Sequence, residues 1–194
     1  MKDSKTILKE LFRKSIHLCS SVIPLFLSLN YWATVYGLLG IVVLYYFCEI
    51  ARLEGHPVIL ISLITETASR QRDECKFVLG PVTLVFGIVL AALLLPFECA
   101  KVGIFALAFG DGLASLAGKL FGRVKLPLTG GKTLEGSLTC FIAVFIATFI
   151  VSGRPVVSFV VAFLATAIEV FPLGDWDNMI IPVITGGVYW LVCL

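Results

Sequence analysis

The chain has 194 residues, of which 59% are hydrophobic and 14% are charged, and its mean hydropathy is +1.01. This composition is too apolar for a soluble domain, and the length leaves no room for a separate soluble domain. The formal net charge of +2 is small, and no basic patch interleaved with aromatic residues predicts binding to nucleic acid. We therefore expect one all-α, multi-pass integral membrane domain over residues 1–194.

Hydrophobic stretches of about 17–24 residues predict a bundle of about seven transmembrane helices. The expected spans are 11–30, 31–51, 77–95, 99–122, 134–152, 155–172 and 178–194. The apolar run 58–64 is too short to span and predicts an interfacial or re-entrant helix. The six cysteines lie in or beside apolar stretches without a CxxC pair, which is typical of small buried hydrophobes rather than of disulfides or zinc ligands.

Lysine and arginine are unevenly distributed among the expected loops. They cluster in the N-terminal tail, in the loop 52–76 and in the region 119–132, whereas the alternate loops carry almost none. The positive-inside rule therefore predicts a cytoplasmic N-terminus, cytoplasmic basic loops and an extracytoplasmic C-terminus.

The first expected span has a polar edge near its cytoplasmic end. Arg13, His17 and Ser21 recur every four residues, and Lys14 adjoins them. Arg13 and Lys14 could simply snorkel to the interface. His17 lies deeper, and for it a structural and a functional role are equally open.

Two further acids are candidates for a supporting role. Glu49 and Arg52 end the second span at a spacing that permits an ion pair on one helix, which favours structural support over catalysis. Glu74 lies in the polar segment that follows the short apolar run, where most side chains should be solvated.

The most informative stretch is 109–137. Asp111 lies near the middle of an expected span, where an unpaired carboxylate is costly and usually functional. On a helix, Asp111, Ser115 and Lys119 share one face. An adjacent stripe of small residues would let a neighbouring helix approach closely, and its members are Ala106, Gly110, Ala114, Gly118 and Gly122. A packing helix with one acid paired to a lysine is the alternative interpretation.

The loop that follows favours the functional interpretation. It carries Arg123, Lys125 and Lys132 together with the run TGGKT at 129–133, directly before the next helix. Positive charge and backbone N–H groups at a helix start form a phosphate site. The run is not a P-loop, because Leu126 stands where that motif requires glycine. An acid for a metal beside a phosphate cradle suggests phosphoryl transfer.

More polar residues follow on the same predicted face. Glu135 begins the next span, where it would favour the helix dipole or bind Mg²⁺. Glu169 ends the sixth span, and Asp177 and Asn178 precede the last. Helix capping accounts for one of these two residues but not for the gathering of all three on the face of the basic loop.

With these residues in place, the chain resembles the family of CTP-dependent lipid kinases, which includes dolichol kinase, phytol kinase and the CTP-dependent diacylglycerol kinase. The resemblance rests on RKSIH near the N-terminus, Glu49 with Arg52, GDGLASLAGKLFG followed by GGKTLEGS, and IEVFP followed by DWDNMIIP. It implies a polytopic enzyme that phosphorylates a lipid alcohol with CTP and a divalent metal. The acceptor would reach the site sideways from the bilayer.

This resemblance and the chemistry of phosphoryl transfer assign roles to individual residues. The expected catalytic residues are Asp111, Lys132, Glu135 and His17. The expected Mg²⁺ ligands are Asp111, Glu135 and Asp177. The expected nucleotide-binding residues are Lys119, Arg123, Gly130, Gly131, Lys132, Thr133, Gly136, Ser137 and Asn178. The expected supporting residues are Arg13, Lys14, Glu49, Arg52, Glu74 and Glu169.

Two other functions remain open at this point. A phosphatidate cytidylyltransferase would use the same CTP and metal but release pyrophosphate. A transporter with an acid in a broken helix predicts internal repeats, and the sequence has none. The identity of the lipid alcohol, the general base and the oligomeric state are also open.

Overall fold

The computed structural model describes residues 4–68, 76–127 and 129–193. Within these ranges the chain is helical, and an isolated antiparallel bridge joins Lys125 to Thr133. The helices are α1 (Ser4–Cys19), α2 (Ile23–Leu29), α3 (Tyr31–Leu53), α4 (Ile59–Ala68), α5 (Gly80–Leu94), α6 (Phe97–Phe105), α7 (Gly112–Leu120), α8 (Leu134–Ser152), α9 (Pro155–Val170) and α10 (Asp177–Cys193). A 3₁₀ turn (Ser20–Val22) joins α1 to α2, and a π-helical turn (Ala106–Asp111) joins α6 to α7.

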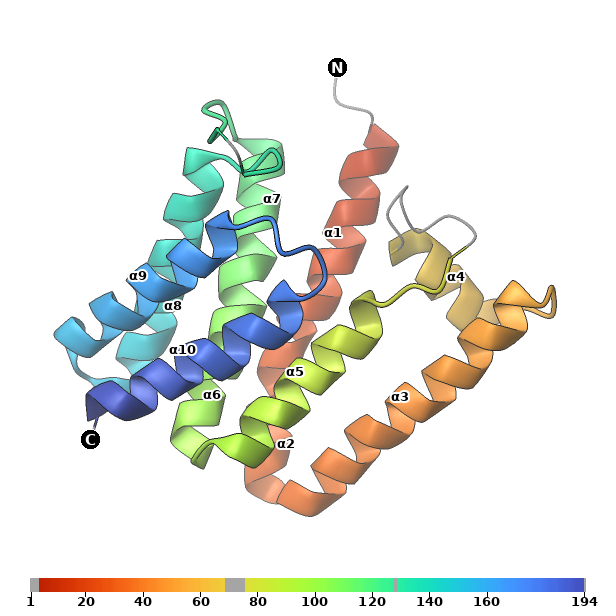
Figure 1. The fold of residues 1–194 in the computed structure, drawn as a ribbon, viewed down its shortest axis with the longest axis horizontal. Coiled ribbons are helices and arrows are strands. Elements are labelled where there is room, and N and C mark those ends of the chain that lie inside the picture. The colour runs from red at the N-terminus through yellow and green to blue at the C-terminus, as the bar shows by residue number, and fades with distance from the viewer. Residues whose placement is uncertain (1–3, 69–75, 128, 194) are drawn as a thin grey trace.

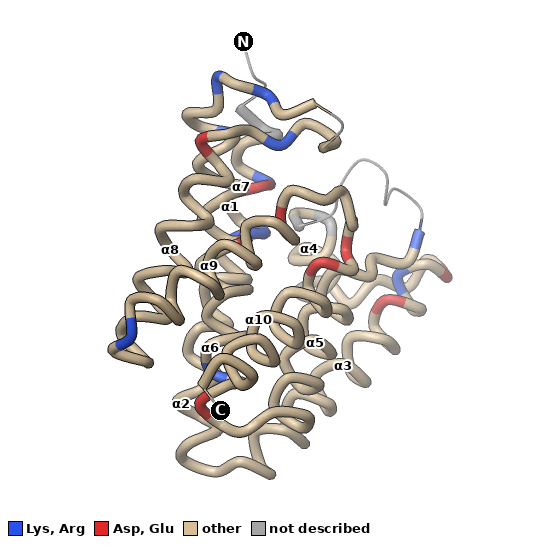
Figure 2. Tube along the Cα trace, turned by 60° about the vertical axis from the view of Figure 1, so that its left-hand side comes forward, with Lys and Arg blue, Asp and Glu red and all other residues tan. Residues whose placement is uncertain are grey.

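The helices run back and forth between two ends of the molecule (Figure 1). The start of α1 and the connection between α7 and α8 lie at one end, whereas the α2–α3 and α5–α6 turns and the C-terminus lie towards the other. Charged residues gather at the end with the start of α1, and the middle parts of the helices carry few (Figure 2). This distribution brings the basic segments together, although the orientation of the two ends in a membrane remains a prediction.

The all-α expectation is confirmed, but the count of about seven spans is not. Three helices are long and apolar enough to cross a membrane, namely Tyr31–Leu53, the continuous helix Phe97–Leu120 and Leu134–Ser152. The segments α5, α9 and α10 are apolar but shorter, at 15, 16 and 17 residues. The first expected span begins earlier, at Ser4, and breaks at the 3₁₀ turn before Pro24, whose ring enters the first turn of α2.

The small-residue stripe is the contact surface between α7 and α8. A Cβ at Gly136 would lie 2.8 Å from the carbonyl oxygen of Ala114, and a Cβ at Gly118 would lie 2.8 Å from Thr133 Oγ1. The two backbones can therefore approach only because side chains are absent. This approach also holds the loop 121–133 beside the end of α7.

We predict that Gly136→Ala lowers the free energy of unfolding by about 1–3 kcal/mol, because the new methyl group meets fixed backbone atoms. Gly40→Ala in α3 is the matched control, since a Cβ there meets nothing within 4 Å. It should be neutral or stabilise by up to about 1 kcal/mol, as alanine favours helix over glycine. Thermal unfolding in detergent measures both, and equal effects would contradict the close α7–α8 contact.

An ion pair ties the end of α3 to the segment before α5. Arg52 Nη2 lies 2.7 Å from Glu49 Oε1, and its Nε donates to Glu49 Oε2 at 2.9 Å. Glu49 also accepts from the backbone N–H of Val78 at 2.9 Å, and Arg52 donates to the carbonyl of Lys76 at 3.0 Å. This arrangement fits the structural support expected of Glu49 and Arg52. Glu74 lies outside the described residues.

Candidate functional site

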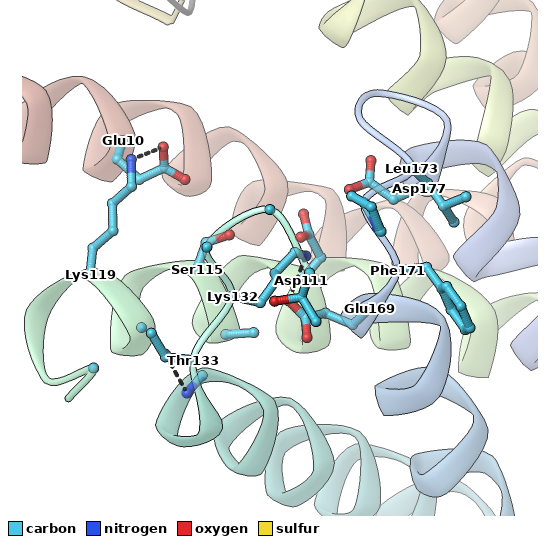
Figure 3. A pocket seen from close by; sticks show the side chains of 18 of the residues that line it. Glu10, Asp111, Ser115, Lys119, Lys132, Thr133, Glu169, Phe171, Leu173 and Asp177 are labelled. Carbon is cyan, nitrogen blue, oxygen red and sulfur yellow. Dashed lines mark hydrogen bonds and ion pairs between the residues drawn. The ribbon is translucent and has the colours of Figure 1, made fainter. Parts of the chain in front are cut away.

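A pocket of about 540 Å³ opens between α1, α7, the loop 121–133 and the connection from α9 to α10; it is called the polar pocket below. Figure 3 shows side chains from all four segments around it. Its basic lining residues are Arg13, Lys14, Lys119, Lys125 and Lys132. Its acidic lining residues are Glu10, Asp111, Glu169 and Asp177.

Asp111 is the most deeply placed acid of the polar pocket. It ends the π-helical turn, a type of distortion that is frequent at functional sites, and it is only 2% exposed. Its carboxylate pairs with the buried ammonium of Lys14 on α1. His17 Nδ1 lies 3.1 Å from the same oxygen, Oδ2, but without the geometry of a hydrogen bond. The ion pair compensates the charge of Asp111, and the RKSIH motif is what supplies it.

Ser115 and Lys119 line the polar pocket on the same helix face as Asp111, as their spacing predicted. Lys119 Nζ reaches across to Glu10 Oε2 on α1 at 2.6 Å, and Arg13 Nη2 lies 2.6 Å from Glu10 Oε1. Burial opposes ionisation of Glu10, but Arg13, Lys119 and Lys14 outweigh it and hold the pKa of this carboxyl below its usual value. Glu10 therefore stays ionised and orients two cations at the rim of the pocket.

The Gly-rich loop folds back on itself above the polar pocket. Gly130 and Gly131 adopt positive φ angles of 68° and 96°, which glycine tolerates without strain. The backbone N–H of Leu126 donates to the carbonyl of Lys132 at 2.9 Å and closes the turn. Lys132 is thereby aimed into the pocket, where its Nζ lies 2.6 Å from Glu169 Oε1 (Figure 3).

The start of α8 fixes the other end of this loop. Thr133 caps the helix by accepting from the backbone N–H of Gly136 at 3.2 Å, and both residues line the polar pocket. Ser137 does not line it but donates to Glu169 Oε2 at 3.3 Å. Glu169, which is 3% exposed, therefore joins α8, α9 and the loop.

Besides Ser137, four of the expected catalytic and nucleotide-binding residues do not line the polar pocket. Glu135 faces the loop backbone, accepting from the N–H groups of Arg123 at 2.9 Å and Val124 at 3.3 Å, and neither Glu135 nor Arg123 lines the polar pocket. His17 lies beside Asp111. The side-chain amide of Asn178 is bound to α5, donating to Thr83 Oγ1 at 3.0 Å.

The expected Mg²⁺ ligands do not come together as a set, because Glu135 is outside the polar pocket. Among the described residues, no three acidic, histidine or cysteine side chains are grouped to hold a metal by themselves. Mg²⁺ bound with a nucleotide needs only one or two carboxylates, since phosphates and water supply the other oxygens. Asp111, Glu169 and Asp177 are carboxylates on the pocket wall and fit that requirement.

The sequence did not single out every residue of the site. Glu10 was missed, although it precedes Arg13 and Lys14 by three and four residues, the spacing of ion pairs on a helix. The segment that follows α9, Phe171 to Gly174, also lines the polar pocket and carries no charge that would have marked it.

Several known proteins are similar to this chain in sequence. A phytol kinase from Synechocystis sp. is 29% identical over 93% of this chain and 78% of that protein. A probable phytol kinase 1, chloroplastic, from Glycine max is 28% identical over 63% of this chain and 46% of that protein. The protein of the same name from Oryza sativa subsp. japonica is 26% identical over 93% of this chain.

The chain thus spans less than two thirds of the length of both plant proteins, at 46% and 64%. No family profile and no solved structure matched. The similarity to the Synechocystis protein nonetheless covers 93% of this chain. Over most of its length the chain is therefore similar to phytol kinases.

Proposed function

We propose that this protein is a membrane kinase that transfers the γ-phosphate of CTP to the hydroxyl group of an isoprenoid alcohol, with Mg²⁺. The observation that carries the proposal is the polar pocket, which Lys14, Lys119 and Lys132 line together with Asp111 and the Gly-rich turn. The names of the relatives supply the class of reaction and of acceptor. The preference for CTP rests on the motifs shared with the CTP-dependent kinases.

The lysines of the polar pocket are suited to hold a polyphosphate. Lys132 and Lys119 are partly exposed, with 25% and 39% of their side chains accessible, and each is now neutralised by a carboxylate. Ammonium groups on long flexible stems can swing from these carboxylates to phosphate oxygens. Phosphoryl transfer depends mainly on such positioning and charge neutralisation, so no covalent intermediate with the protein is required.

The acidic residues have a complementary task. When Mg²⁺ is bound, it supplies charge neutralisation for the transferred phosphoryl group. Asp111 and Glu169 would hold the cation, and their present partners Lys14 and Lys132 would hold the phosphates of the nucleotide.

The proton of the acceptor hydroxyl needs a base within hydrogen-bond reach. His17 does not line the polar pocket, although its Nδ1 lies 3.1 Å from Asp111 Oδ2. We therefore assign the proton to a carboxylate oxygen of Asp111 or Asp177 and give His17 a positioning role beside Asp111. In this proposal His17 is a positioning residue, although the sequence predicted that it is catalytic.

Two labelling positions in CTP test the reaction. Purified protein in detergent or liposomes is incubated with CTP labelled at the γ- or the α-phosphate and with phytol, a polyprenol, diacylglycerol or phosphatidate. We expect the γ-label to enter an isoprenoid alcohol, with CDP as the second product and no reaction in EDTA. Entry of the α-label into phosphatidate with release of pyrophosphate would instead identify a cytidylyltransferase, and equal use of ATP would remove the CTP preference.

A further inference from the structure

A second pocket of about 520 Å³ lies between the start of α5 and the α9–α10 connection; it is called the apolar pocket below. Figure 1 shows this connection passing beside the beginning of α5. The walls are formed largely by apolar side chains, with Thr83 and Asp175 as the polar members of the lining; the apolar side chains are Leu79, Val82, Phe86, Leu173, Trp176 and Met179. An apolar cavity of this size is within the range of about 300–1,000 Å³ that holds small ligands.

The two pockets adjoin each other. Leu173 and Gly174 line both. On α10, Asp177 faces the polar pocket, while Met179, two residues further on, faces the apolar one. A ligand that occupied both would therefore place a polar head near Asp177 and an apolar chain against Met179.

The wall between α5 and α10 is built rigidly. Asn178 donates from its side-chain amide to Thr83 Oγ1 at 3.0 Å and lies 3.4 Å from the carbonyl oxygen of Gly80. A Cβ at Gly87 would overlap the carbonyl oxygen of Asn178, so the two helices are in direct backbone contact. The apolar pocket is thus preformed, and the side chain of Asn178 ties α10 to Thr83 in its wall.

We propose that the apolar pocket holds the hydrocarbon chain of the lipid alcohol, with the hydroxyl group passing Leu173 and Gly174 into the polar pocket. The proposal rests on the proposed function and adds where the acceptor binds. The occupant must combine one apolar chain with a small polar head, because the apolar pocket continues into a charged one. A single-chain isoprenoid alcohol meets both conditions, and a two-chain lipid with a charged headgroup does not.

Photolabelling tests the location without requiring turnover. The probe is a long isoprenoid alcohol with a diazirine in its chain, and its methyl ether is the matched control. In the detergent-solubilised full chain, we expect the alcohol to label residues 79–86 or 173–179 and unlabelled phytol to reduce this labelling. Labelling spread over the exposed faces of α3 and α8, or equal labelling by the ether, would overturn the proposal.

Filling the pocket provides the second test. We expect Val82→Trp to raise the KM for phytol by a factor about tenfold or more larger than the factor by which it raises the KM for geraniol. The reason is that the longer chain of phytol needs more of the cavity. The KM for CTP should change by less than about twofold, since the polar pocket is untouched. Leu93→Trp is the matched control on α5, because Leu93 is 49% exposed and lines neither pocket, and it should leave both values unchanged.

The outcomes separate this proposal from the proposed function. Phosphorylation of phytol together with equal effects of Val82→Trp on phytol and geraniol would reject the apolar pocket and leave the kinase standing. Specific labelling of the apolar pocket without any transfer from CTP would reject the kinase and support the binding site.

Discussion

Asp111→Asn is expected to lower the rate of phosphoryl transfer by about 10²–10³-fold, equivalent to about 3–4 kcal/mol of transition-state stabilisation. Asparagine keeps the size of the side chain but removes the negative charge that attracts a divalent cation. The measurement is kcat with CTP and phytol over a range of Mg²⁺ concentrations. A ligand of the cation should also show a raised Mg²⁺ requirement, which a purely structural residue would not.

Asp111→Asn should also lower the stability of the protein, because the partner of Asp111 is buried. Lys14 is 2% exposed and pairs with Asp111, so Asp111→Asn leaves an ammonium group uncompensated inside the protein. Breaking a buried pair from one side costs about 3–5 kcal/mol, whereas removing both charges is often nearly neutral. The double variant Lys14→Met with Asp111→Asn is therefore the control, and its thermal unfolding should be close to that of the unmodified protein.

The double variant decides between the two interpretations of the ion pair. If the pair only stabilises the contact of α1 with α7, restoring stability restores activity as well. If the pair serves the reaction, stability returns while transfer stays about 10²-fold or more below normal. Recovery of activity in the double variant would remove Asp111 and Lys14 from the mechanism.

Features that depend on local spacing could be predicted from the sequence. The apolar run of α8 was expected at 134–152 and is found there, because its length and its capping Thr133 are both local signals. The stripe that includes Gly118 likewise identified the surface on which α8 packs. The shared face of Asp111 and Lys119 survived the π-helical turn, because that turn ends at Asp111 and leaves the helix after it regular.

Partners that lie far apart in the sequence could not be predicted. Lys14 and Asp111 are 97 residues apart, and Glu10 and Lys119 are 109 residues apart, so no periodicity links them. The direction of Glu135 was equally hidden, since a helix start can aim an acid at a ligand or at its own preceding loop. The count of about seven spans stays a prediction, because α5, α9 and α10 are apolar but shorter than the three helices that are long enough to span.

Lys132→Ala should reduce kcat/KM for CTP by about 10²–10³-fold, because the Gly-rich turn aims this ammonium group at the centre of the polar pocket. The variant should lower kcat if Lys132 contacts the phosphoryl group in the transition state. It should raise KM if Lys132 only holds the bound nucleotide. Steady-state kinetics with CTP as the varied substrate makes this distinction. Lys101→Ala is the matched control, since it also breaks a lysine–glutamate pair, the exposed one with Glu98 at 3.2 Å, and should change the kinetics by less than about twofold.

The ion-pair partner Glu169 provides a control for Lys132→Ala. Glu169 is 3% exposed, so removal of Lys132 leaves a buried carboxylate without its ion-pair partner. The hydroxyl group of Ser137 still donates a hydrogen bond to it. Adding Glu169→Gln to Lys132→Ala removes the stranded charge and should restore thermal stability. If activity returned with stability, Lys132 would be a structural lysine that secures the loop to α9. Continued loss of transfer in a stable double variant is the expected result, because the positive charge needed by the phosphates is still missing.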